Sequence, residues 1–282
     1  MKRRVSEMNW KPWLLLLPAL LLLALAFLYP IGKMLLLSLF DPSFTLRHYE
    51  RLFGDPSYLK VLWVTFRIAI SVTVCTLIIG YPLAYYLSQI RPKVAGMLMI
   101  FVVVPYFTSV LVRTYAWTVL LGTDGVINQA LMKLHLIDHP LRIMYTGLSV
   151  LIGMTYVLLP YMVLALFSVM KGIDVRLLSA AESLGASRIS SFVRVFIPLS
   201  MPGIAAGGLL VFILSIGFFI TPALMGSPQD GMISMLIESQ VETYFDWNFA
   251  SALASVLLFC TILLFVAYER FVGLKRLFES KL

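Results

Sequence analysis

A group of acidic and aromatic residues near the C-terminal end of the chain has the chemistry to bind an organic cation. Glu238 and Glu242 are four residues apart, so on a helix their carboxylates share one face. Tyr244, Asp246 and Trp247 follow at once. Carboxylates with aromatic neighbours hold ammonium groups through ion pairs and cation–π contacts. The same residue types also occur in a solvated loop or in a contact with another protein, and both alternatives stay open.

Arg113 is a second candidate, because it lies within an apolar segment beside Tyr115 and Trp117. A charge in such a segment costs roughly 2.5–3.5 kcal/mol on insertion into a membrane. Its position therefore indicates a structural ion pair or a place on the wall of a cavity, and its aromatic neighbours could equally form an interface belt. Lys33 and Arg67 lie closer to the ends of their segments, where long side chains extend to the polar boundary.

Motifs for catalysis, phosphate binding or metal binding are absent from the sequence. The one Gly-Lys pair, at 32–33, precedes Met34 and is no Walker-type loop. The three histidines lack metal-ligand spacing: His48, His135 and His139. We expect no catalytic residues, no metal and no cofactor in this chain. Energy for any active transport would come from a partner or from an ion gradient.

The elements that must position these residues are long apolar segments. Hydrophobic residues make up 60% of the chain and charged residues 13%. Six segments approach the ~20 residues that a helix needs to cross a bilayer: Trp13–Leu39, Leu62–Ile90, Met97–Leu121, Gly147–Met170, Met201–Met225 and Phe249–Val272. The sequence therefore predicts an all-α integral membrane protein, with one six-span domain over 13–272 between short termini at 1–12 and 273–282.

Basic residues are distributed unevenly between the two sides of this arrangement. Most of them fall in 1–12, 91–96, 171–196 and 269–282, whereas the opposite connections carry only five: Arg47, Arg51, Lys60, Lys133 and Arg142. The positive-inside rule then places both termini in the cytoplasm. This topology accounts for the net charge of +8 without nucleic acid.

Proline positions suggest where helices are interrupted within the membrane. We expect Pro105 and Pro222 to mark broken helices that line a pathway, and the other prolines to be ordinary kinks. The connection from Gly122 to Tyr145 predicts a turn and then an interfacial helix, with Asn128 near its start.

The polar stretch from Asp174 to Pro198 predicts two short helices joined at Gly185, where a helix favours a left-handed residue. Asp174 is a suitable cap for the first helix, and Pro198 is expected to end the unit. The stretch is either a cytoplasmic loop that contains helices or a docking element for a soluble partner.

Ala180-Ala181, Gly185, Val195 and Ile197-Pro198 resemble the EAA loop of the membrane subunits of ABC importers, although Ser179 stands at the position of the motif's glutamate. Glu182 is near but out of register. The resemblance implies a coupling helix that sits in a groove of the ATP-hydrolysing subunit. The residues that it assigns to coupling are Ala180, Ala181, Glu182, Leu184 and Gly185.

Further segments resemble the spermidine/putrescine branch of these permeases: Val112–Trp117, Leu120–Gly122, Gly125–Asn128, Tyr156–Met162 and Asp246-Trp247. The resemblance implies a multi-pass protein of the bacterial inner membrane that moves a small organic solute, above all a polyamine, by alternating access. Its expected partners are cytoplasmic ATPase subunits that bind ATP, a second permease, an outer soluble binding protein and membrane lipid. The candidate pathway or substrate contacts are Arg113, Tyr115, Trp117, Glu238, Glu242, Asp246 and Trp247.

Two other classes of function remain open on the sequence. One is a gradient-driven transporter or channel that works without an ATPase, and the other is a membrane scaffold. Intramembrane carboxylates, which gradient coupling usually requires, are not evident in the spans.

Overall fold

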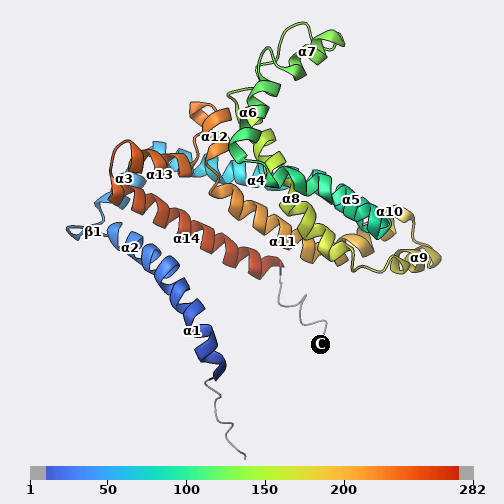
Figure 1. The fold of residues 1–282 in the computed structure, drawn as a ribbon, viewed down its shortest axis with the longest axis horizontal. Helices are drawn as coiled ribbons and strands as arrows, with labels where there is room; N and C mark the ends of the chain where they lie inside the picture. Colours follow the sequence, from blue (N-terminus) through green and yellow to red (C-terminus); the bar gives the residue numbers. More distant parts are fainter. Residues whose placement is uncertain (1–10, 273–282) are drawn as a thin grey trace, which may run out of the picture. The chain divides into compact units, whose positions relative to one another are not determined.

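The computed structural model describes residues 11–272, which form helices and one very short β-hairpin (Figure 1). The chain divides into two compact units, one of 1–54 with 237–258 and the other of 55–236 with 259–282. The charged termini that contribute to the topology prediction lie largely outside the described residues.

The first unit begins with a helical segment made of α1 (Lys11–Leu23), η1 (Ala24–Leu28) and α2 (Tyr29–Leu37). The hairpin of β1 (Phe40–Asp41) and β2 (Ser43–Phe44) leads into α3 (Arg47–Gly54). The unit also contains the end of α13 (Ile233–Glu242) and the first half of α14 (Trp247–Val272). No residue of Leu16–Leu37 is buried within the chain, so this leucine-rich surface faces lipid or another protein.

The second unit contains the remaining elements in chain order. They are α4 (Pro56–Gln89), α5 (Pro92–Val103), η2 (Val104–Phe107), α6 (Val110–Leu121), α7 (Val126–Lys133), α8 (Gly147–Met170), α9 (Arg176–Ser183), α10 (Arg188–Ser191), η3 (Phe192–Phe196), α11 (Ile197–Ile216), α12 (Ile220–Met225) and η4 (Pro228–Asp230). The start of α13 and the end of α14 complete it.

Five helical segments of the described chain are long and apolar enough to cross a membrane: Leu16–Leu37, Pro56–Gln89, Gly147–Met170, Arg188–Ile216 and Trp247–Arg270. A sixth span exists if Pro92–Phe107 and Val110–Lys133, which meet at 97°, are one broken segment. The predicted all-helical membrane architecture is therefore confirmed, with a sharp bend in the third span.

Two spans are interrupted, as the prolines suggested. Pro105 lies in the 3₁₀ turn η2, and the extended residues Thr108 and Ser109 then separate it from α6. In the fifth span the break falls at Gly217 to Phe219, just before Pro222, which lies inside α12. A role of these breaks in a pathway stays a prediction.

The expectation that Pro198 ends the polar unit is wrong. The helix continues from Arg188 through the π-helical turn η3 into α11 without interruption. Pro198 occupies the first turn of α11, where the fixed proline φ suits a helix and the missing N–H costs little.

Helices α4, α8 and α11 pack together into the core of the second unit (Figure 1). Glycine allows the close approach of α8 and α11, because a Cβ added at Gly207 would lie 2.8 Å from Met162 Sδ and 3.2 Å from Ala165 Cβ. Small residues have this role at helix contacts in membranes, where backbones must come close.

We expect Gly207→Ala to destabilise the protein by about 1–3 kcal/mol, because Met162 can move aside but Ala165 Cβ cannot. Thermal unfolding of the purified protein in detergent measures the effect. Gly208→Ala is the matched control, since a Cβ there would meet only ordinary contacts at 3.9 Å. Equal stability of the two variants would contradict the close packing of α8 and α11.

The predicted helix after Gly122 is present as α7, which projects away from the α4–α8–α11 core at the end of α6 (Figure 1). Buried Asn128 donates to the carbonyls of Gly122 and Leu141, both at 3.0 Å, and accepts from the Leu141 N–H. One amide side chain therefore fixes the whole connection.

Candidate functional site

The polar stretch forms the predicted helix–turn–helix. Helix α9 ends at Ser183 with Leu184 as its C-cap, and Gly185 adopts φ +92° in the left-handed region. Gly185 N–H donates to the Glu182 carbonyl and Ala186 N–H to the Ala181 carbonyl, the two bonds of a Schellman cap. Asp174 accepts from the Arg176 N–H at the start of the unit, as expected of a capping residue.

The turn presents apolar side chains to its surroundings. Leu184 is 90% exposed and Ile189 is 78% exposed, while Ala180 and Glu182 are also exposed and Ala181 is half-buried. Exposed apolar groups beside small residues are typical of a surface that docks against a groove. The assignment of these residues to coupling stays a prediction.

The second half of the turn is fixed firmly to the core by aromatic contacts. Phe192 packs edge-on against Tyr81 and Tyr85, with ring centroids 6.2 and 5.2 Å apart, and stacks on Phe196. The Tyr81 hydroxyl shares a 2.8 Å hydrogen bond with the Ser200 hydroxyl. A displacement of the turn must therefore move α4 and α11 as well.

Arg113 is buried on α6, with only 8% of its surface exposed. Its Nε and Nη1 atoms are buried and have no hydrogen-bond partner within the described residues. The next residue, Thr114, lies 3.3 Å from the Thr221 hydroxyl, so the two half-helices that follow the breaks, α6 and α12, meet here. Tyr115 is exposed, whereas Trp117 packs edge-on against Tyr156 at 5.4 Å.

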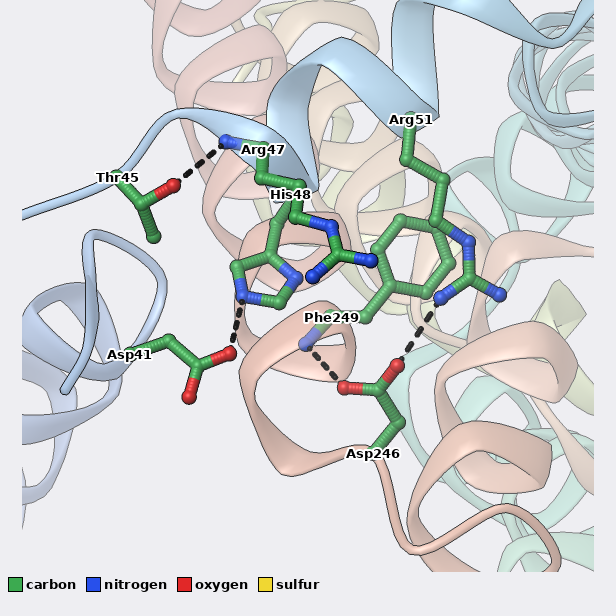
Figure 2. Close-up of polar contacts among 7 residues, drawn as sticks. All are labelled: Asp41, Thr45, Arg47, His48, Arg51, Asp246 and Phe249. Carbon is green, nitrogen blue, oxygen red and sulfur yellow. Dashed lines mark hydrogen bonds and ion pairs between the residues drawn. The ribbon is translucent and has the colours of Figure 1, made fainter.

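The acidic group lies in the first unit. Glu238 and Glu242 are both exposed on α13, which confirms that they belong to one helix at helical spacing. Asp246 instead has structural partners, as Figure 2 shows. Its Oδ1 accepts from the Phe249 N–H at 3.0 Å, which makes it the N-cap of α14, and its Oδ2 pairs with Arg51 Nη1 at 3.0 Å.

Arg51 also lies 4.1 Å above the Phe249 ring, so α3 is attached to the start of α14 by an ion pair and a cation–π contact (Figure 2). His48 Nε2 lies 3.3 Å from Asp41 Oδ2 and links α3 to the hairpin. Trp247 is exposed beside the cap. The contact of Asp246 and Trp247 with a solute stays a prediction.

We expect Asp246→Ala to destabilise the protein by about 1 kcal/mol more than Asp246→Asn. Asparagine keeps the cap, which is worth about 1 kcal/mol, and loses only a partly exposed ion pair worth about 0–1 kcal/mol. Thermal unfolding in detergent measures the difference, and Glu242→Gln, an exposed carboxylate on the neighbouring helix, is the control. Equal melting temperatures for the two Asp246 variants would contradict the capping role.

A buried carboxylate that sequence reasoning missed lies after α12. Asp230 is 7% exposed and is the only buried acid among the residues that the structure describes. Its Oδ2 accepts from the Ser227 hydroxyl at 2.5 Å and from the Ser227 N–H at 3.3 Å. The signal was present in Ser227-Pro-Gln-Asp230, because Ser-x-x-Asp is the spacing of a capping box.

A family model described as "Binding-protein-dependent transport system inner membrane component" matches residues 76–274. The chain belongs to this family. It is therefore a multi-pass permease of the inner membrane, of the kind that works in ABC importers.

Several curated relatives align with this permease over most of its length. PotB, a spermidine/putrescine transport system permease protein of Escherichia coli K12, is 37% identical over 94% of this chain and 95% of its own. The protein of the same name from Haemophilus influenzae is 37% identical over 93% and 90%. PotC of Escherichia coli K12 is 28% identical over 80% and 79%.

Two solved structures of a bacterial alginate ABC transporter have the same fold as this permease. In the first, the TM-score is 0.72 at 15% identity, with 94% of this chain and 96% of that chain covered. In the second, which holds a periplasmic protein bound to alginate pentasaccharide, the TM-score is 0.75 at 18% identity, with the same coverage.

Proposed function

We propose that this permease is a transmembrane subunit of an ATP-driven polyamine importer. The observation that carries the proposal is the near full-length alignment with permeases named for spermidine and putrescine transport. The exposed, Schellman-capped turn at Gly185 supports coupling to a separate ATPase subunit, because it offers a rigid apolar surface to a soluble partner. Ala180, Ala181, Glu182, Leu184 and Gly185 form this coupling surface.

The proposed complex contains a second, related permease, ATPase subunits that bind ATP, and a soluble binding protein on the outer side. Similarity to both PotB and PotC supports a pair of related permeases. The turn and both termini face the cytoplasm, as the distribution of basic residues favours. Arg113, Tyr115, Trp117, Glu238, Glu242, Asp246 and Trp247 are the proposed solute contacts.

In the proposed mechanism, ATP binding draws the ATPase subunits together and moves the Gly185 turn together with α4 and α11. A swing from 1:99 to 99:1 between two states needs about 5.5 kcal/mol of differential binding. The aromatic attachment of Phe192 to α4 supports efficient transmission, since a loosely held turn would dissipate the motion.

Uptake of labelled spermidine and putrescine tests the proposal, in cells that lack the gene and every other polyamine uptake system, with and without its restoration. We expect uptake to depend on the restored gene and on ATP. Co-purification from detergent should recover an ATPase subunit and a second permease. Polyamine uptake without any ATPase would favour a gradient-driven carrier. If cells with the restored gene took up no polyamine, the proposed substrate would be excluded.

A further inference from the structure

The carboxylate of Asp230, in the second unit, has one oxygen that is fully hydrogen-bonded and one that is available to a ligand. Oδ2 accepts two bonds from Ser227. Oδ1 has no hydrogen bond from the described residues, and its nearest cation, Arg67 Nη2, is 3.9 Å away. A charge-assisted bond forms at about 2.7–2.9 Å. The ion pair is therefore too long to satisfy Oδ1.

The loop that carries Asp230 is held on both sides before any ligand arrives. On one side, the Ser149 hydroxyl of α8 donates to the Met225 carbonyl at 2.7 Å. On the other side, the Ile233 N–H donates to the Thr65 hydroxyl of α4 at 2.9 Å. Fixing a binding group in advance lowers the entropic cost of binding.

Gly147 makes the room in which Oδ1 lies. A Cβ at this position, the first residue of α8, would be 2.9 Å from Oδ1. Any side chain at position 147 would therefore displace the Asp230 carboxylate.

Arg67 can leave the pair easily, because its side chain is 56% exposed and its guanidinium has no other ion pair within the described residues. A compact ammonium group approaches one carboxylate oxygen more closely than this extended guanidinium does. Arg67 can pair with Asp230 again when the ammonium group leaves, so the carboxylate keeps a cation nearby before and after binding.

We propose that Asp230 receives an ammonium group of the transported solute on its way through the permease, in exchange for Arg67. The inference rests on the proposed polyamine function and names a residue for it. The site takes primary or secondary ammonium ions and rejects anions. It lies at the end of α8 opposite to the coupling turn, since Asp230 contacts Gly147 whereas the turn follows Met170.

The test uses the complete complex in proteoliposomes with its binding protein, labelled spermidine and ATP, and measures uptake and hydrolysis in the same vesicles. Asp230→Asn keeps the size of the side chain, and Gly147→Ala keeps the charge but displaces Oδ1. For both variants we expect about a tenfold fall in spermidine moved per ATP, equivalent to about 1.4 kcal/mol. Hydrolysis stimulated by the loaded binding protein stays at the wild-type rate.

Asp138→Asn is the matched control, because Asp138 is an exposed acid of the same unit. Its ratio of uptake to hydrolysis should equal that of the wild type. An unchanged ratio in Asp230→Asn overturns the proposal, and so does an equal fall in uptake and hydrolysis, which would assign Asp230 a purely structural role. A wild-type complex that moves no spermidine would instead refute the polyamine function itself.

If the Asp230 variants do not assemble into the complex, Arg67→Gln tests the exchange of cations at Asp230. Removal of the competing cation should lower the spermidine concentration at half-maximal uptake and also lower the maximal rate, because release becomes slower. Wild-type values for both quantities would contradict the exchange.

Discussion

A Gly185→Val variant is expected to reach the membrane at the wild-type level and to lose most of its transport. The glycine has φ +92°, where L-residues are strained, and a Cβ there would meet no atom within 4 Å. The penalty is therefore conformational and not steric, of about 1–3 kcal/mol. Relief of this strain opens the Schellman cap and displaces Leu184 from its docking position.

A series at this position separates backbone strain from loss of contact area. We expect uptake at equal membrane abundance to decrease in the order Gly, Asn, Ala, Val, because asparagine tolerates left-handed backbone best among the substitutes. Valine should reduce ATP-coupled uptake about tenfold or more, given that 1.4 kcal/mol is a factor of ten. Gly172→Ala is the control in the same connection, since its φ is outside the left-handed region and its Cβ would meet only an ordinary contact. Normal uptake by Gly185→Val would refute the role of this turn in coupling.

An Arg113→Met variant is expected to be more stable than the wild type and to transport less solute. The guanidinium is buried and its Nε and Nη1 are unpaired, so methionine removes the cost of a buried charge while it keeps much of the side-chain length. On insertion scales this cost is about 2.5–3.5 kcal/mol. Thermal unfolding in detergent should show a higher melting temperature.

Arg142→Met is the matched control, because Arg142 is exposed where it lines a hollow of about 270 Å³ and its replacement should hardly change stability. Uptake by Arg113→Met should fall several-fold at equal abundance, as expected if a costly charge is retained for transport. A lower melting temperature would show that Arg113 has a stabilising partner. Wild-type uptake would remove Arg113 from the proposed solute contacts.

The turn at Gly185 could be predicted from the sequence, although its end at Pro198 could not, because the determinants of the turn are local. A capping aspartate at 174, a glycine at 185 and a capping serine at 187 each act within one helical turn. The apolar spans could also be predicted from the sequence, since the thickness of the bilayer sets their length.

The bend of the third span and the role of Asp230 could not be predicted in the same way. Pro105 indicates that a helix is interrupted, but it does not give the 97° angle of the bend or the packing of α6 against α12, which is distant in the sequence. Asp230 is buried by contacts with Gly147 on α8 and Arg67 on α4, both distant in the sequence. Asp246 has suitable chemistry for a cation, yet its cap to Phe249 and its pair with Arg51 already engage both oxygens.

The uninterrupted helix from Arg188 to Ile216 has a mechanical consequence. Its 29 residues span about 44 Å at 1.5 Å per residue. One end emerges from the Gly185 turn, and the other stops at the Gly217 break beside α12. A tilt of about 10° around either end would shift the opposite end by roughly 8 Å over that length. In the proposed mechanism the span is therefore a lever arm, whose stiffness converts a small rotation at the Gly185 turn into a larger displacement at the Gly217 break.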